Sequence, residues 1–161
     1  MEAESGLVPG RLARGSRCFG AWVGHELVGY GWLSTKSEWI GEIELEIGLN
    51  PGEAYVWNCV TLAPHRMKGV FRSLVTAFVA QAHKEGLARL WIASIVGVGG
   101  KTIEQAGFQP VLRFDSNKRL GLQWLRVMPV KGVDPDLGAA ARKALAVKAG
   151  MSVRRSTRRR H

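Results

Sequence analysis

The sequence predicts an α/β fold in which a mixed, mainly antiparallel central sheet is flanked by helices. Three observations predict it: a period-two alternation over residues 42–49, a helical spacing of apolar residues over 70–82, and a nearly continuous apolar run over 90–96. The chain has 161 residues, the length of one domain. Its 46% hydrophobic content excludes a wholly disordered chain.

The first half of the chain is expected to form antiparallel strands. Residues 1–16 are small and polar and are expected to be a loose segment. Two apolar runs, 18–23 and 27–33, are joined by a short glycine-containing turn and predict a β-hairpin. Residues 42–49 then predict a strand with one buried face, and residues 54–62 predict a further strand.

The second half alternates helices and strands before it ends in a basic segment. The helix over 70–82 is expected to stop at Gly86, and residues 90–96 predict a central strand. A glycine-rich loop leads into a short helix, and two strands over 108–114 and 120–128 follow, joined by a turn at 115–118. We therefore expect a loose segment over 1–16, one domain over 17–130, and a linker with a basic tail over 131–161.

The positive charge is concentrated at the C-terminal end. The chain carries 23 Lys and Arg against 13 Asp and Glu, a formal net charge of +10. Residues 138–161 contain eight of these bases and no acid, so the rest of the chain is nearly neutral. A nucleic-acid-binding fold more often carries its charge on a folded face. The tail over 138–161 predicts either a weak nucleic-acid contact through phosphates or a solubilising end.

Several classes of protein are excluded by composition. No apolar stretch reaches the roughly 18 residues of a membrane span, so no membrane association is expected. The two cysteines, Cys18 and Cys59, are too few for a disulfide scaffold. Glu2 and Glu4 stand where a secretory signal carries positive charge, which favours the cytoplasm. The four histidines lack ligand-like spacing, so no metal is expected.

The segment 58–75 carries the chemistry. A buried strand is expected to run into the turn Arg66-Met67-Lys68-Gly69, and a helix starts directly after it. The first backbone N–H groups of a helix are unpaired and carry a partial positive charge. Gly69 lets an anion approach the backbone, and Arg66 and Lys68 add positive charge. The segment therefore predicts a cradle for a pyrophosphate.

These residues resemble a known family. The stretch 66–71, Arg-Met-Lys-Gly-Val-Phe, resembles motif A of the GNAT superfamily of N-acetyltransferases, R/Q-x-x-G-x-G/A, and residues 101–108 resemble the end of its motif B. The resemblance covers residues 17–130 and implies acetyl-CoA as the acyl donor. It implies that the backbone amides of the turn hold the pyrophosphate and that main-chain groups of the preceding strand pair with the pantetheine arm. The cofactor-binding residues that it implies are Val60, Thr61, Leu62, Arg66, Met67, Lys68, Gly69, Val70 and Phe71.

The chain departs from the family pattern in four places, one of which is the missing asparagine near the start of the helix of motif B. Phe71 stands where the motif has Gly or Ala, and its ring reaches the cradle unless it turns toward the core. Ile103 stands where many members have a tyrosine that protonates the departing thiolate. The family's first strand and first two helices, which build one wall of the acceptor pocket, have no expected counterpart ahead of Arg17.

An amine acceptor must lose a proton before it attacks, because its pKa is near 10. A carboxylate or a water chain beside the strand 54–62 would accept that proton. Glu53 is the candidate base and Tyr55 the candidate acid, because Glu53, Tyr55, Trp57 and Cys59 are expected to share one strand face. The alternative interpretation of Glu53 is a charge beside a turn.

The expected function is acetyl transfer from acetyl-CoA to an amine, on a small molecule or a protein, by direct attack in a ternary complex. A homodimer is one expected assembly. The alternatives are a CoA- or partner-binding module without catalysis and a basic-tailed nucleic-acid accessory protein. The glutamates of residues 42–46 indicate a solvated face or a surface for a cationic acceptor. Residues 99–102 imitate the end of a P-loop, but Ile95 stands at the position of its first glycine, which favours a loop that lets strand and helix pack closely.

Overall fold

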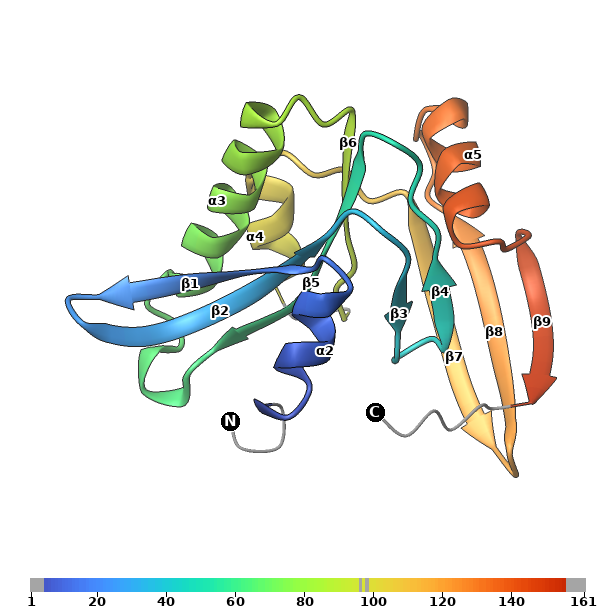
Figure 1. Cartoon of the computed structure of the whole chain (residues 1–161). Helices are drawn as coiled ribbons and strands as arrows, with labels where there is room; N and C mark the ends of the chain where they lie inside the picture. The colour runs from blue at the N-terminus through green and yellow to red at the C-terminus, as the bar shows by residue number, and fades with distance from the viewer. Residues whose placement is uncertain (1–4, 96, 98, 156–161) are drawn as a thin grey trace. The chain divides into compact units, whose positions relative to one another are not determined.

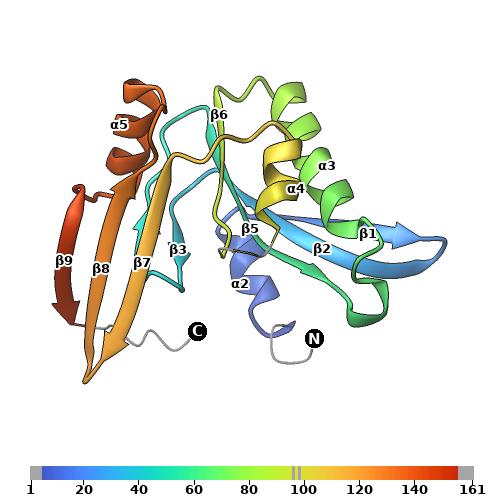
Figure 2. The same ribbon diagram turned by 180° about the vertical axis from the view of Figure 1, so that it is seen from behind.

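The computed structural model describes residues 5–95, 97 and 99–155 and confirms the mixed α/β fold. The chain forms two compact units (Figures 1 and 2), each considered by itself below. The first unit comprises Met1–Lys36 with Leu49–Phe108, and the second comprises Ser37–Gly48 with Gln109–His161. No helix of the described part has the length and hydropathy that a membrane crossing requires.

The first unit is built on a four-stranded sheet in the order β1-β2-β5-β6. Strands β1 (Arg17–Val23), β2 (Glu26–Ser34) and β5 (Glu53–Thr61) pair antiparallel, and β6 (Arg89–Ile92) pairs parallel to β5. The predicted hairpin over 18–33 is therefore confirmed. Strand β6 ends four residues before the predicted strand 90–96 does, and Val96 lies outside the described residues.

Helix α3 (Val70–Lys84) packs its apolar stripe on one face of this sheet. The short helix α4 (Gly100–Gln105) lies beside α3. Arg72 of α3 donates from its Nη2 to Gln105 Oε1 of α4 at 2.9 Å. The helical spacing predicted over 70–82 is confirmed, because the buried side chains of α3 recur every three to four residues. These buried residues are Val70, Leu74, Val75, Phe78 and Ala82.

A β-bulge interrupts β5. Trp57 pairs with Trp32 and Val60 pairs with Tyr30, so two residues of β5 oppose one residue of β2. One of the two, Asn58, has a positive φ of 45°. An extra residue reverses the inside–outside alternation beyond it.

The bulge changes which residues of β5 share a face. Ala54 and Val56 belong to the core under α3, and Cys59 packs against the same core. The prediction that Cys59 shares a face with Glu53 and Tyr55 is therefore wrong. A strict period of two would have placed Cys59 opposite the core, and the extra residue at the bulge turns it inward.

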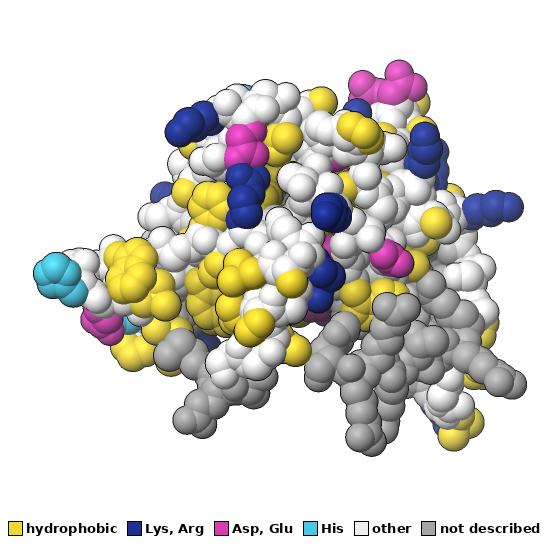
Figure 3. Space-filling model, in the orientation of Figure 1, with side chains coloured by type: hydrophobic (Ala, Val, Ile, Leu, Met, Phe, Trp, Pro, Cys, Tyr) yellow, Lys and Arg dark blue, Asp and Glu magenta, His cyan; other side chains and the backbone are white. Residues whose placement is uncertain are grey.

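An exposed apolar surface marks the end of the β1–β2 hairpin (Figure 3). Trp22 is 62% exposed there, and Val23 is also exposed. Glu26, at the start of β2, pairs with His65 of the 3₁₀ turn η1 (Ala63–His65) at 3.1 Å. The hairpin is thus joined to the segment that leads from β5 toward α3.

The second unit contains two antiparallel sheets and one helix. Its three-stranded sheet has the order β7-β8-β9. The β7–β8 hairpin closes at Leu120-Gly121, both with positive φ, so the turn predicted at 115–118 is wrong. Two consecutive residues with positive φ form the primed turn that matches strand twist. The elements are β3 (Glu38–Ile40), β4 (Leu45–Ile47), β7 (Leu112–Arg119), β8 (Leu122–Pro129), α5 (Pro135–Ala144) and β9 (Gly150–Arg155).

The segment 42–49, predicted to be one strand, contains the turn of a hairpin followed by the short strand β4. Residues 41–44 form the turn between β3 and β4, and Glu44 has a φ of 48°. Glu44 pairs with Lys118 of β7 at 2.7 Å. The prediction of a continuous row of glutamates on one strand face is therefore wrong, because Glu42 and Glu44 lie in the turn.

The two chain ends contain elements where loose segments were expected. Helix α2 (Val8–Ala13) lies within the segment 1–16, and α5 and β9 lie within 131–155. The Oδ1 atom of Asp134 caps α5 by accepting the N–H of Asp136 at 2.8 Å. A short helix is marginal alone, and buried small residues on one face of α5 supply its tertiary support. The rest of the predicted tail, residues 156–161, lies outside the described residues.

The contact of α3 with β2 predicts a specific sensitivity at Gly29. A Cβ there would lie 2.8 Å from the Val60 carbonyl oxygen and 2.8 Å from Val70 Cγ1. We expect Gly29→Ala to lower the free energy of unfolding by about 1–3 kcal/mol, measured by urea denaturation. Gly100→Ala is the control, since nothing lies within 4 Å of its added Cβ. Equal stability of the two variants would contradict this packing.

Candidate active site

Strands β5 and β6 part halfway along β5. Their pairing runs from Glu53 opposite Arg89 to Val56 opposite Ile92, whereas β5 continues to Thr61. Within the described part of the chain, no strand pairs with the β6 side of β5 beyond Val56. Main-chain N–H and C=O groups on an open strand edge can pair with an extended ligand as an added strand does. The open edge includes the predicted residues Val60 and Thr61.

The start of α3 lies a short turn after this edge. Gly69 is the N-cap residue with a φ of 83°, and no side chain caps the helix. The first turn contains no acidic residue. Several backbone N–H groups therefore lack partners within the helix, and the helix dipole adds positive potential there. This is an environment for an anion, as the sequence predicted.

The turn has room for a phosphate group. A Cβ built at Gly69 has no atom within 4 Å. Arg66, Met67 and Lys68 are exposed, and Met67 has a positive φ of 61°. Arg66 Nε lies 3.4 Å from the carbonyl oxygen of Thr61, which joins the turn to the end of β5. These residues fit the diphosphate of acetyl-CoA.

The ring of Phe71 lies away from this space. It is half-buried and packs against Gly99, where an added Cβ would come within 2.7 Å of Phe71 Cε1. The ring is not among the atoms within 4 Å of the Cβ position at Gly69. The aromatic side chain therefore turns toward the start of α4, and its size does not fill the space at Gly69.

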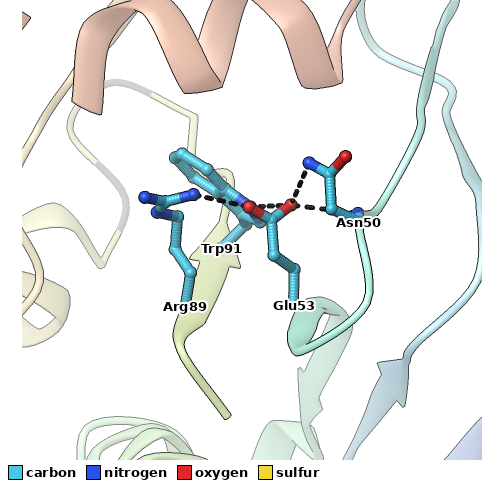
Figure 4. Close-up of polar contacts among 4 residues, drawn as sticks. All are labelled: Asn50, Glu53, Arg89 and Trp91. Carbon is cyan, nitrogen blue, oxygen red and sulfur yellow. Dashed lines mark hydrogen bonds and ion pairs between the residues drawn. The ribbon is translucent and has the colours of Figure 1, made fainter. Parts of the chain in front are cut away.

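Glu53 accepts hydrogen bonds from two segments, strand β6 and the turn before β5 (Figure 4). Its Oε1 accepts Arg89 Nη1 at 2.6 Å, and its Oε2 accepts Trp91 Nε1 at 3.3 Å. The same Oε2 accepts the backbone N–H and the Nδ2 of Asn50, each at 3.2 Å. Glu53 is only 4% exposed. Both carboxylate oxygens are thus engaged, and the side chain joins β5 to β6 where the two strands are still paired.

The network sets the charge state of Glu53. Burial by itself would raise the pKa of Glu53, but the hydrogen bonds from the Asn50 backbone, Arg89, Trp91 and the Asn50 side chain outweigh it and lower this pKa. A carboxylate that is strongly stabilised as the anion is a weak proton acceptor. The geometry therefore favours the alternative interpretation of Glu53 as a structural charge beside a turn.

Tyr55 and Trp57 lie on the face of the sheet opposite α3. Tyr55 is buried and pairs in register with Trp91 of β6, one residue before the last pair of the two strands. The guanidinium of Arg11, in α2, lies 4.7 Å from the centroid of the Trp57 ring and 5.1 Å from that of Trp32. This stacking covers the face with a residue that the sequence placed in a loose segment. The local sequence signal that could have indicated helix α2 is a proline in its first turn.

Two further residues are not available for acid–base work. Burial raises the pKa of the Cys59 thiol to about 12, which agrees with its packing against the core under α3. Ile103 is buried in α4. The position of the family tyrosine thus presents no hydroxyl group.

Comparison with protein families gives the class of this protein. The model of the acetyltransferase (GNAT) family matches residues 4–98, and the chain belongs to this family. The match includes α2 and the whole β1-to-β6 sheet. The predicted resemblance is thereby confirmed. Membership of this family supports acyltransferase activity with acetyl-CoA as the donor.

Solved structures share the fold at low sequence identity. A "probable acetyltransferase" is 19% identical, with a TM-score of 0.53 over 74% of this chain and 76% of that one. A Bacillus subtilis acetyltransferase solved in complex with CoA is 20% identical, with a TM-score of 0.50 over 71% of this chain and 64% of that one. A Trypanosoma brucei acetyltransferase is 15% identical, with a TM-score of 0.50 over 72% and 75%. No curated protein matches the chain.

The Glu53 network predicts how stability depends on pH. The pKa of Glu53 is lower in the folded chain, so its contribution is present above about pH 4.5 and is lost as the pH falls through the folded pKa. We expect Glu53→Gln to lower the free energy of unfolding by about 1–3 kcal/mol at pH 7 and to flatten its decline in acid. Thermal denaturation between pH 7 and pH 2 measures both effects.

Glu85→Gln is the matched control for this measurement. A hydrogen bond from Arg17 lowers the pKa of Glu85 to about 2, but both side chains are partly exposed. Removal of the Glu85 carboxylate should change how the free energy of unfolding depends on pH in acid, but should lower it less at pH 7 than Glu53→Gln does. If Glu53→Gln leaves the stability at pH 7 unchanged, Glu53 does not join the two strands.

Proposed function

We propose that this chain transfers the acetyl group of acetyl-CoA to an amine by direct attack in a ternary complex. The observation that carries the proposal is the open edge of β5 beside an uncapped helix start with free space at Gly69. Family membership supports acyl transfer, and a structure with the same fold was solved in complex with CoA. The acceptor is an amine on a small molecule or a protein, and the proposed compartment is the cytoplasm.

The donor would be held mainly by main-chain groups. The backbone N–H groups of residues 67–71 would bind the diphosphate, with Arg66 and Lys68 beside it. Main-chain groups of Val60 and Thr61 would pair with the pantetheine arm along the open edge. Leu62 was also predicted to pair with it, but its N–H donates to the Val28 carbonyl and its carbonyl accepts the His65 N–H, each at 2.9 Å. Binding by backbone groups needs no particular side chain there, which agrees with Met67 and Phe71 standing at these positions.

The transfer itself needs one bond made and one bond broken. The amine nitrogen attacks the thioester carbonyl carbon, the carbon–sulfur bond breaks, and the CoA thiolate takes up a proton. Oriented N–H groups at the edge of β5 would stabilise the negative charge on the carbonyl oxygen. Tyr55 is the proposed acid for the thiolate, because it lies one residue before the strands part and Ile103 offers no hydroxyl. A water chain would accept the amine proton, since both oxygens of Glu53 are engaged.

A second candidate function is a CoA-binding module without catalysis. Two observations favour it: the isoleucine at the position of the family tyrosine and the fully engaged carboxylate of Glu53. Both functions require CoA binding, so binding alone does not distinguish them. Release of free CoA thiol in the presence of amines does.

CoA binding is tested at Gly69. Gly69→Glu places a negative charge against the diphosphate, and we expect the affinity for CoA, measured by isothermal titration calorimetry, to fall by on the order of 100-fold or more. Gly86→Glu, at the other end of α3, is the matched control, because both glycines have positive φ and open space around the added Cβ. Equal affinities in the two variants would place the diphosphate elsewhere. Gly69→Ala separates the effect of charge from backbone strain.

Catalysis is tested at Tyr55. With acetyl-CoA and a panel of primary amines, we expect thiol release by the unmodified chain and a fall in kcat of about 100-fold in Tyr55→Phe. The KM for acetyl-CoA should stay within about twofold, because the proposed role is proton transfer and not binding. An unchanged kcat in Tyr55→Phe would assign the acid to another group. CoA binding without thiol release from any amine would favour the non-catalytic module.

A further inference from the structure

The outer face of the β7–β8–β9 sheet combines an aromatic ring, apolar side chains and arginines. Residues that pair directly across antiparallel strands lie on the same face of a sheet. The register pairs Asn117 with Trp124, Asp115 with Arg126, and Arg119 with Leu122. It also pairs Trp124 with Val153 and Arg126 with Met151. These side chains therefore share one face of the three strands.

The opposite face forms the core of the second unit. Gln123 and Leu125 alternate with the outer residues of β8 and are fully buried, and Val127 is also buried. Gln123 Nε2 donates to Ser116 Oγ at 2.9 Å. The outer face takes no part in this core. Its mixture of side chains is therefore not required by packing, and its substitution should leave the fold intact.

A shallow groove of about 300 Å³ lies on the outer face. Trp124 is half-buried in it, whereas Met151 is 69% and Val153 is 52% exposed. A partly exposed ring and two exposed apolar side chains thus lie on a charged surface. The groove is lined by Asp115, Ser116, Asn117, Trp124, Arg126 and Met151.

The charge on this face favours a polyanion. Arg113, Arg119 and Arg126 are exposed on it, and its one acid in the described part, Asp115, lies 3.9 Å from Arg113. No ion pair joins Arg119 or Arg126 to a described acidic group. Residues 109–161 carry 13 Lys and Arg against three Asp. The basic C-terminal run begins on β9, where Arg155 pairs in register with Leu122 at the end of the β7–β8–β9 sheet.

We propose that the outer face of the β7–β8–β9 sheet binds single-stranded nucleic acid. Unpaired bases stack on exposed aromatic rings, and arginines hold the intervening phosphates. Trp124 is the stacking residue, with Met151 and Val153 beside it, and Arg119 and Arg126 are the phosphate contacts. A duplex keeps its bases stacked on each other and offers Trp124 no free base surface. This places the contact on a folded sheet, where the sequence had indicated only the basic tail.

The test uses fluorescence anisotropy of the full chain with a fluorescein-labelled strand of about twelve uridines. We expect Trp124→Leu to weaken binding by about 5- to 100-fold, because it keeps an apolar side chain but removes the ring. Trp124→Phe should retain most of the affinity. Circular dichroism checks that each variant is folded.

The phosphate contacts are tested by salt dependence. The slope of log affinity against log salt, measured between about 50 and 200 mM, should decrease by about 1.4 in Arg119→Gln/Arg126→Gln. The control Lys131→Gln/Lys143→Gln removes the same charge from exposed positions outside the face and should change the slope much less. Equal effects of the two pairs would mean a general response to net charge and would overturn the proposal.

Other occupants are separated by the same assay. A duplex of equal length should bind more weakly than the single strand and should be insensitive to Trp124→Leu. Equal binding of heparin and the uridine strand, both insensitive to Trp124→Leu, would indicate a general polyanion contact and overturn the proposal. Binding that disappears in Arg158→Gln/Arg159→Gln/Arg160→Gln but persists in Trp124→Leu would assign the contact to the tail alone. None of these readouts depends on acetyl transfer, so the proposal stands or fails independently of the proposed function.

Discussion

The extra residue in β5 is the constraint on which the rest of the site depends. β5 pairs with β2 on both sides of Asn58, but it pairs with β6 only before that point. The bulge increases the local bend of the strand, and the two parallel strands then separate. Separation leaves main-chain groups on the edge of β5 next to the start of α3, where helix N–H groups are also unpaired. A ligand with an extended amide arm and a diphosphate matches both sets of groups.

The Glu53 network fixes the place where the separation begins. The buried carboxylate receives donors from β6 and from the turn before β5, so the paired half of the two strands is held on one side of the sheet. On the other side, the core under α3 holds the same strands. The buried charge is tolerated because all its donors are present, and loss of one donor would leave part of the negative charge of Glu53 uncompensated.

The chain divides its chemistry between its two units. The family match covers residues 4–98, which contain the open edge and the helix start. Residues 109–161 contribute 13 Lys and Arg and the half-buried Trp124 of the three-stranded sheet. A phosphate site built from backbone N–H groups needs little net charge, whereas a surface for a polyanion needs many side-chain cations. The uneven distribution of charge along the sequence agrees with the two proposed ways of binding phosphate.

The sequence by itself determined the α3 stripe, the glycine turn at Gly69 and the β1–β2 hairpin, because their signals are periodicity and glycine geometry within a few residues. It also indicated the acetyltransferase family from the residues of that turn. Only the tertiary structure decided the bulge at Asn58, the engagement of Glu53 by Arg89, the stacking of Arg11 on Trp57 and the pairing of β9. Each of these depends on a partner that is distant in the sequence or on one inserted residue, and no local pattern contains that information.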